Sequence, residues 1–136
     1  MRLFILDTGH LTLLRQSHSA AVTRAVLVPR DELATTVITF EEQVSGWYTA
    51  VRKARDAEKL ARAYAGLDEV AQTARVIRIL PFSREAIALY LDTKKQHPRL
   101  GKMDLAIALH NRATLVTRNR QDFEPIAGLT LEDWSA

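Results

Sequence analysis

The segment 101–123 constrains the fold more than any other part of the chain. Its first half has the composition of a helix, and Asp104 shares a face with the apolar residues that follow it by one turn. The β-branched run 114–117 then predicts a short buried strand. A polar turn that carries Asp122 ends this strand. The order of helix, strand and turn predicts two carboxylates near one edge of a sheet.

Strand and helix patterns alternate along the rest of the chain. Buried strands are expected at 2–6, 33–38 and 76–80, with an edge strand at 129–131. Helices are expected at 11–14, at 20–28, from Thr39 through an Ala-rich charged segment to a stop at Gly66, at 67–73, and from a Ser83 cap to just before His97. Such alternation is typical of an α/β fold, and predicts a mostly parallel sheet covered on both faces, in one domain spanning residues 1–136.

Composition excludes several classes of protein. The chain has 136 residues, of which 47% are hydrophobic, with few Gly and Pro, so disordered and collagen-like structures are excluded. No apolar run approaches the roughly 18 residues of a membrane span. The apolar run at the start of the sequence is too short to predict a signal peptide. Because Cys is absent, disulfides and Cys-type zinc sites are excluded as well. We expect a cytoplasmic protein without a membrane, and the formal charge of +3 mildly favours an anionic partner.

Four acids from distant parts of the chain are expected at one edge of the sheet. In open parallel sheets, ligands bind outside the carboxyl ends of the strands. Asp7 ends the first strand, Glu42 lies in the first helical turn after the second, and Asp104 and Asp122 flank the fourth. Clustered carboxylates repel one another unless a cation neutralises them, and hard oxygen ligands select Mg²⁺ or Mn²⁺. Such an ion can activate water for the hydrolysis of a phosphodiester.

Each acid also has a purely structural interpretation. Thr39 and Glu42 have the spacing of a helix capping box. Asp104 can complement a helix N-terminus, and Asp122 can belong to a capped turn. Asp7 is the hardest to explain in this way, because it ends a strongly apolar run. The joint placement of the four acids, more than any one of them, favours a metal site.

Three segments of the chain resemble the PIN-domain nucleases. They read FILDTGHLTLL, VITFEEQVSGW and GKMDLAIALHNRATLVTRNRQDF, the last followed by IAGLTLEDW. Within these nucleases the chain is similar to the VapC-like ribonuclease toxins of bacterial type II toxin–antitoxin pairs. The resemblance implies a PIN-like three-layer α/β/α fold with an endoribonuclease site dependent on Mg²⁺ or Mn²⁺. It also implies a homodimer and inhibition by a small cognate antitoxin.

The resemblance assigns roles to individual residues. The expected catalytic residues and metal ligands are Asp7, Glu42, Asp104 and Asp122, with Asp7 and Asp104 the firmest ligands and Glu42 preferred over Glu41. The residues expected to orient a ligand or a water are Thr8, His10, Thr117 and Asn119, and those expected to contact RNA phosphates are Lys102, Arg118 and Arg120. The family most often has Asn or Asp where this chain has Gly9, so activity or metal affinity is expected to be reduced.

A second basic feature lies outside the expected site. Arg52, Arg55, Lys59 and Arg62 recur at helical spacing and predict one basic stripe. The stripe is either a solvated helix face or a contact surface. The opposite face of the same segment is small and apolar, and suits packing against another helix.

Other functions remain open at the level of sequence. Asp7-Thr8-Gly9 also spells the signature of aspartic proteases, although that class needs a mostly β chain. The PIN-like fold can also serve as a binding module without activity, or as an RNA-processing nuclease without an antitoxin.

Overall fold

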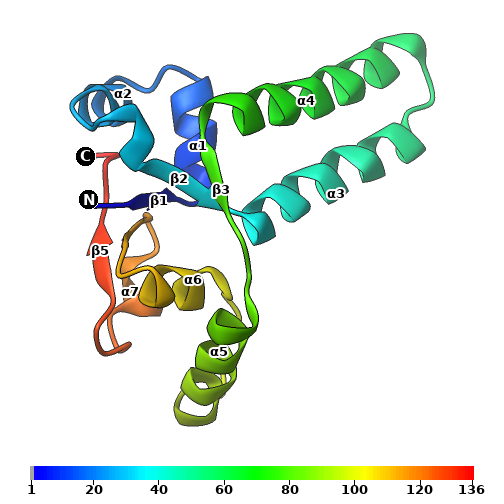
Figure 1. Ribbon diagram of the computed structural model, residues 1–136. Coiled ribbons are helices and arrows are strands. Elements are labelled where there is room, and N and C mark those ends of the chain that lie inside the picture. Colours follow the sequence, from blue (N-terminus) through cyan, green and yellow to red (C-terminus); the bar gives the residue numbers. More distant parts are fainter. Residues whose placement is uncertain (1) are drawn as a thin grey trace.

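A five-stranded sheet forms the centre of the computed structural model, which describes residues 2–136 (Figure 1). The strands are β1 (Phe4–Leu6), β2 (Leu33–Thr36), β3 (Arg78–Leu80), β4 (Thr114–Val116) and β5 (Thr130–Glu132). Their order in the sheet is β3-β2-β1-β4-β5, and every neighbouring pair is parallel. The predicted α/β fold with a mostly parallel sheet is confirmed, and the expected edge strand is β5.

The helices are α1 (Thr8–Arg15), α2 (Ser19–Val26), α3 (Val37–Lys53), α4 (Ala57–Val76), α5 (Arg84–Gln96), α6 (Asp104–His110) and α7 (Arg120–Phe123), with a short 3₁₀ turn (Arg30–Glu32) before β2. In Figure 1, α1 and α2 lie on one side of the sheet, and α5, α6 and α7 on the other. Between residues 2 and 136, we find no helix with both the length and the apolar character needed to cross a bilayer.

The central strand β1 divides its side chains between two cores. Phe4 and Leu6 belong to the core under α1 and α2, whose other buried members are Leu11, Ala25, Val116 and Trp134. Ile5 points to the opposite face and joins the larger core built with α5, α6 and α7. All three residues of the strand are buried. The apolar run therefore reflects a strand covered on both faces, as parallel sheets require.

The start of α3 differs from the sequence prediction. The strand expected through Ile38 ends at Thr36, and the helix begins at Val37. The Thr36 hydroxyl accepts a hydrogen bond from the backbone N–H of Thr39 at 3.0 Å, so Thr36 is the N-cap. The alternative interpretation of Thr39 and Glu42 as a capping box is therefore wrong. A side-chain cap outweighs the strand preference of the β-branched residues that follow it.

The helices α3 and α4 form an antiparallel hairpin that projects from the sheet, here called the arm (Figure 1). The sequence predicted one helix through this region with a stop at Gly66, which is wrong. The chain turns after Lys53, and the Asp56 side chain caps α4 by accepting from the backbone N–H of Lys59 at 2.8 Å. Gly66 lies inside α4 and against the ring of Trp47. Glycine is required there for the close approach of two helices, not for ending one.

We predict opposite effects for alanine at two glycines of the arm. A Cβ at Gly66 would overlap the ring carbons of Trp47, so Gly66→Ala should lower the free energy of unfolding by about 1–3 kcal/mol. A Cβ at Gly46 meets nothing within 4 Å, so Gly46→Ala should raise it by up to about 1 kcal/mol. Urea unfolding followed by circular dichroism measures both. Equal stabilities of the two variants would contradict the packing of Trp47 on Gly66.

Candidate active site

Asp7 directly follows β1 and caps α1. Its Oδ1 accepts a hydrogen bond from the backbone N–H of His10 at 2.8 Å and lies 3.2 Å from His10 Nδ1. Burial alone would raise the pKa of the Asp7 carboxyl. Hydrogen bonds from the side chain and backbone of His10, and from Thr117, outweigh burial and hold this pKa below its ordinary value. Asp7 is therefore a carboxylate at neutral pH.

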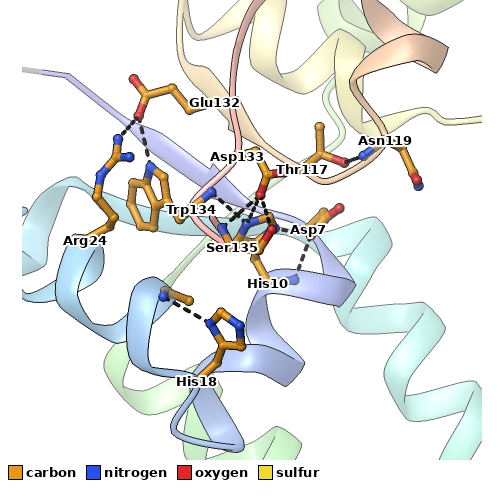
Figure 2. Close-up of polar contacts among 11 residues, drawn as sticks. Asp7, His10, His18, Arg24, Thr117, Asn119, Glu132, Asp133, Trp134 and Ser135 are labelled. Atoms are coloured by element: carbon orange, nitrogen blue, oxygen red, sulfur yellow. Dashed lines mark hydrogen bonds and ion pairs between the residues drawn. The ribbon is translucent and has the colours of Figure 1, made fainter.

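The His10 ring is fully buried between Asp7 and the C-terminal segment (Figure 2). Its Nε2 accepts a hydrogen bond from the backbone N–H of Trp134 at 3.1 Å. A ring nitrogen that accepts carries no proton, so the proton of the neutral ring is assigned to Nδ1, where it faces Asp7. Asp133 Oδ1 lies farther from Nε2, at 3.4 Å. These contacts hold the ring against the Asp7 carboxylate, and the orienting role expected for His10 stays a prediction.

The segment that closes over His10 is held by Trp134. The indole is 1% exposed, packs against Phe4 with ring centroids 5.5 Å apart, and donates from Nε1 to Glu132 at 2.9 Å. Glu132 also pairs with Arg24 at 3.0 Å (Figure 2). Sequence reasoning missed this contact with the candidate site. The signal for it was a large aromatic residue in a short polar C-terminal stretch.

Asp104 is the most buried of the predicted acids, with 7% of its surface exposed. Its Oδ1 accepts from the Thr36 hydroxyl and its Oδ2 from the Thr39 hydroxyl, each at 3.0 Å. Burial raises the pKa of Asp104 above its ordinary value. The two hydroxyls counter this only in part, and the negative charge of Asp7 adds to it. The sequence placed Asp104 on a buried helix face, and the structure confirms that placement, but the two threonine donors were not foreseen.

Parallel topology explains why these acids meet. Asp7 leaves β1 at its carboxyl end, and Thr36 ends β2 beside it. The helix α6 runs back across the sheet to feed β4, so its first residue, Asp104, lies at the same edge. This is the edge at which ligands bind in open parallel sheets.

One pocket of about 190 Å³ brings three of the four predicted acids together. Its lining includes Asp7, Glu42 and Asp104, together with Thr8, Gly9, Lys102, Thr117, Arg118 and Asn119. The fourth acid, Asp122, lines a neighbouring cleft of about 800 Å³ that shares Glu42, Lys102 and Phe123 with the pocket. Arg120 lines neither of these two hollows, and His10 lies behind Asp7.

Comparison with known proteins adds to this geometry. No model of a protein family matches the chain. Ribonuclease VapC1 of Haemophilus influenzae (strain R2866) is 29% identical to it, over 98% of this chain and 98% of that protein. The VapBC-1 structure from nontypeable Haemophilus influenzae has a TM-score of 0.77 at 20% identity, covering 98% of this chain and 99% of its own. A toxin–antitoxin complex from Klebsiella pneumoniae has a TM-score of 0.67 at 22% identity, with 96% of both chains covered. The chain is similar in sequence to a VapC ribonuclease, and it has the PIN-like fold of these solved structures.

The donor set of the candidate site fits Mg²⁺ or Mn²⁺. Its carboxylates are hard oxygen donors, and the chain has no Cys. In the part of the chain that the structure describes, no three His, Asp or Glu side chains stand close enough together to hold an ion by themselves. Mg²⁺ usually takes one or two protein carboxylates and keeps several waters, so Asp7 and Asp104 satisfy its needs. A cation would also remove the repulsion by which Asp7 raises the pKa of Asp104.

Gly9 leaves space in the candidate site. A Cβ built at Gly9 would lie 3.5 Å from Asp7 Oδ1, an ordinary van der Waals distance. The polar side chain that the family usually has at this position therefore has room next to Asp7. The lower activity or metal affinity expected from Gly9 stays a prediction.

We predict that Asp104→Asn stabilises the metal-free protein. Because folding raises the pKa of Asp104, the native state binds more protons than the unfolded state above pH 3.8. Stability contributed by this group is therefore lost as the pH rises through its folded pKa. Asn carries no charge and still has an oxygen for one threonine. Urea unfolding in EDTA at pH 7 should show a higher free energy of unfolding for the variant than for wild type, reduced by the weakening of the second hydrogen bond.

The same variant should lose the stabilisation that Mn²⁺ gives to the wild-type protein. The increase in melting temperature on adding Mn²⁺ measures this, because an ion that binds only the folded state stabilises it. Two results would contradict this interpretation of Asp104. They are a variant that is less stable than wild type in EDTA, and a variant whose melting temperature rises as much as that of wild type when Mn²⁺ is added.

Proposed function

We propose that this chain is an endoribonuclease that hydrolyses RNA phosphodiesters with Mg²⁺ or Mn²⁺, held directly by Asp7 and Asp104 and through a bound water by Glu42. The observation that carries the proposal is the pairing of two Asp carboxylates at the carboxyl edge of a parallel sheet, one with a lowered pKa and one with a raised pKa. A curated relative named as a ribonuclease matches nearly the whole chain and supports this function.

Asp7 and Asp104 have different roles in binding the ion. When bound, the ion supplies an activated water and stabilises the charge on the leaving oxygen. Asp7 offers a carboxylate that stays ionised, because His10 donates to it from the ring and the backbone. Asp104 offers a second carboxylate whose orientation is fixed by hydroxyl donors on both of its oxygens, Thr36 and Thr39. Neither carboxylate has to reorganise when the ion binds.

The remaining predicted residues lie around this pair. Glu42 is exposed at the start of the arm and completes the ligand set. Asp122, in the neighbouring cleft, supports a second ion or the attacking water. Lys102 and Arg118 line the pocket and meet the phosphates next to the scissile one. Arg120 is assigned to phosphates farther along the strand, since it lines neither hollow.

The same proposal makes the chain the toxin of a type II toxin–antitoxin pair, cytoplasmic, homodimeric and inhibited by a cognate antitoxin. Solved VapBC and toxin–antitoxin complexes that share its fold support this role. Ile87 and Leu91, one turn apart on α5, expose 38% and 55% of their surfaces and offer apolar area to a partner chain. The aspartic-protease alternative is excluded, because it requires a mostly β chain and this sheet is parallel and covered by helices.

We predict that Asp7→Asn abolishes RNA cleavage without unfolding the protein. Asn is as good an N-cap as Asp and still accepts from the backbone N–H of His10, but it offers the ion no charge. Cleavage of a panel of cellular RNAs with Mn²⁺ should fall by about 100-fold or more, since the ion's stabilisation of the transition state is worth several kcal/mol. Circular dichroism checks the fold. Undiminished cleavage by Asp7→Asn would refute the site, and a wild-type protein that cleaves no RNA would favour a binding module.

We predict that Glu42 and its neighbour Glu41 differ in the same assay. Glu42 lines both hollows, whereas Glu41 lines neither and accepts from the Ser45 hydroxyl at 2.6 Å. Glu42→Gln should lower cleavage by about tenfold or more, because it removes a charge beside the ion. Glu41→Gln, the matched control on the same helical turn, should stay within about twofold of wild type. Equal effects of the two substitutions would show that Glu42 is not a ligand.

A further inference from the structure

A third hollow lies along the arm, between the second half of α3 and the first half of α4. Its volume is about 360 Å³, and it is lined by Trp47, Lys53, Lys59, Arg62 and the small residues Ala50, Ala54 and Ala63. Three of these seven side chains are cations and none is an acid. Here this hollow is called the arm pocket. The alanines keep it open, and the Trp47 ring that forms one wall is backed by Gly66.

The arm pocket replaces the basic stripe expected from the sequence. Because the chain turns after Lys53, the cations do not lie on one helix. Lys59 and Arg62 line the arm pocket, whereas Arg52 and Arg55 do not, and Arg52 instead lies over the Tyr48 ring at 5.8 Å. The turn therefore separates the basic residues into a group at the pocket and a group outside it.

Positive charge is concentrated at this end of the arm. Residues 52–62 contain five Lys or Arg and two Asp or Glu, so their net charge equals the +3 of the whole chain. The other residues balance one another. One of the two acids, Asp56, serves as the cap of α4, and the other, Glu58, pairs with Arg62 only at 3.5 Å between highly exposed side chains. Such exposed pairs are weak, so the cations remain available to an anionic ligand.

The arm pocket and the candidate active site are linked by α3. Glu42, which lines the active-site pocket, and Lys53, which lines the arm pocket, are both on this helix. Their separation is close to three helical turns, so they lie on the same side of α3, about 16 Å apart along its axis. A stacked single strand advances 3.4 Å per nucleotide, so about five nucleotides cover this distance.

We propose that the arm pocket binds the backbone and one base of a single-stranded RNA whose scissile phosphate lies at Asp7 and Asp104. The inference rests on the proposed ribonuclease function for the identity of the strand. Lys53, Lys59 and Arg62 meet phosphates, and the half-buried Trp47 offers an indole face to a base. Cations combined with an aromatic platform are the means by which proteins hold single strands without reading their sequence. An acidic peptide would use the cations but would have no need of the ring.

Binding of two RNA lengths tests this proposal. Labelled mixed-sequence single strands of about 20 and about 4 nucleotides are titrated by fluorescence anisotropy in EDTA, so that no cleavage occurs; by the spacing above, only the longer one spans both pockets. The test variant is Lys53→Ala/Lys59→Ala. The matched control is Arg52→Ala/Arg55→Ala, which removes the same charge from the same arm outside the pocket.

The test variant should bind the long RNA about tenfold or more weakly, and the magnitude of its slope of log K against log salt should fall by about 1.4, which is two single-strand contacts. The control should stay within about twofold of wild type on both strands.

Several results would overturn the arm pocket as an RNA site. They are unchanged binding of the long RNA and equal weakening by the test and control variants. Weaker binding of the cognate antitoxin with intact RNA binding would assign the pocket to an acidic protein segment instead. The proposed function fails separately: a wild-type protein that binds the long RNA but cleaves none refutes the ribonuclease and leaves the arm pocket standing.

Discussion

The two hydroxyls that hold Asp104 are the interaction on which the candidate site depends. Thr36 ends β2, Thr39 lies in the first turn of α3, and Asp104 begins α6, so the two hydrogen bonds join three elements at one edge of the sheet. The carboxylate is buried, and a buried charge without donors costs several kcal/mol. Together the two hydroxyls therefore fix the orientation of the Asp104 carboxylate and tie it to the base of the arm.

The two central acids show how environment separates identical side chains. Both Asp7 and Asp104 lose water on folding, which raises the pKa of a carboxyl. Asp7 is compensated by a backbone N–H, an imidazole and a hydroxyl, and its pKa falls. Asp104 has two hydroxyls and faces the charge of Asp7, and its pKa rises. The protein's own donors therefore stabilise the charge of Asp7, whereas the charge of Asp104 would be stabilised most by a bound cation.

Local pattern predicted those parts of the fold that local forces decide. The strands were predicted because each is a short apolar run between polar segments, such as the run around Ile5. The burial of Asp104 was predicted because it lies one helical turn from apolar residues. The β-branched residues around Thr36 indicate a strand, yet one side-chain hydrogen bond turns them into a helix start. The turn of the arm has no Gly or Pro to mark it and depends on the cap at Asp56. Gly66 was wrongly predicted to end a helix, because the sequence does not show that Trp47 of the neighbouring helix packs against it.

The site also depends on contacts that no local pattern contains. Trp134 and His10 are separated by 124 positions, yet the backbone N–H of the one decides which nitrogen of the other carries the proton. If Nδ1 lacked that proton, its lone pair would face the Asp7 carboxylate at 3.2 Å and repel it. The C-terminal segment therefore acts on Asp7 through a neutral ring that is fixed from behind. The ring, the two threonines and Trp134 all belong to the chain itself, so the fold orients both carboxylates through its own contacts.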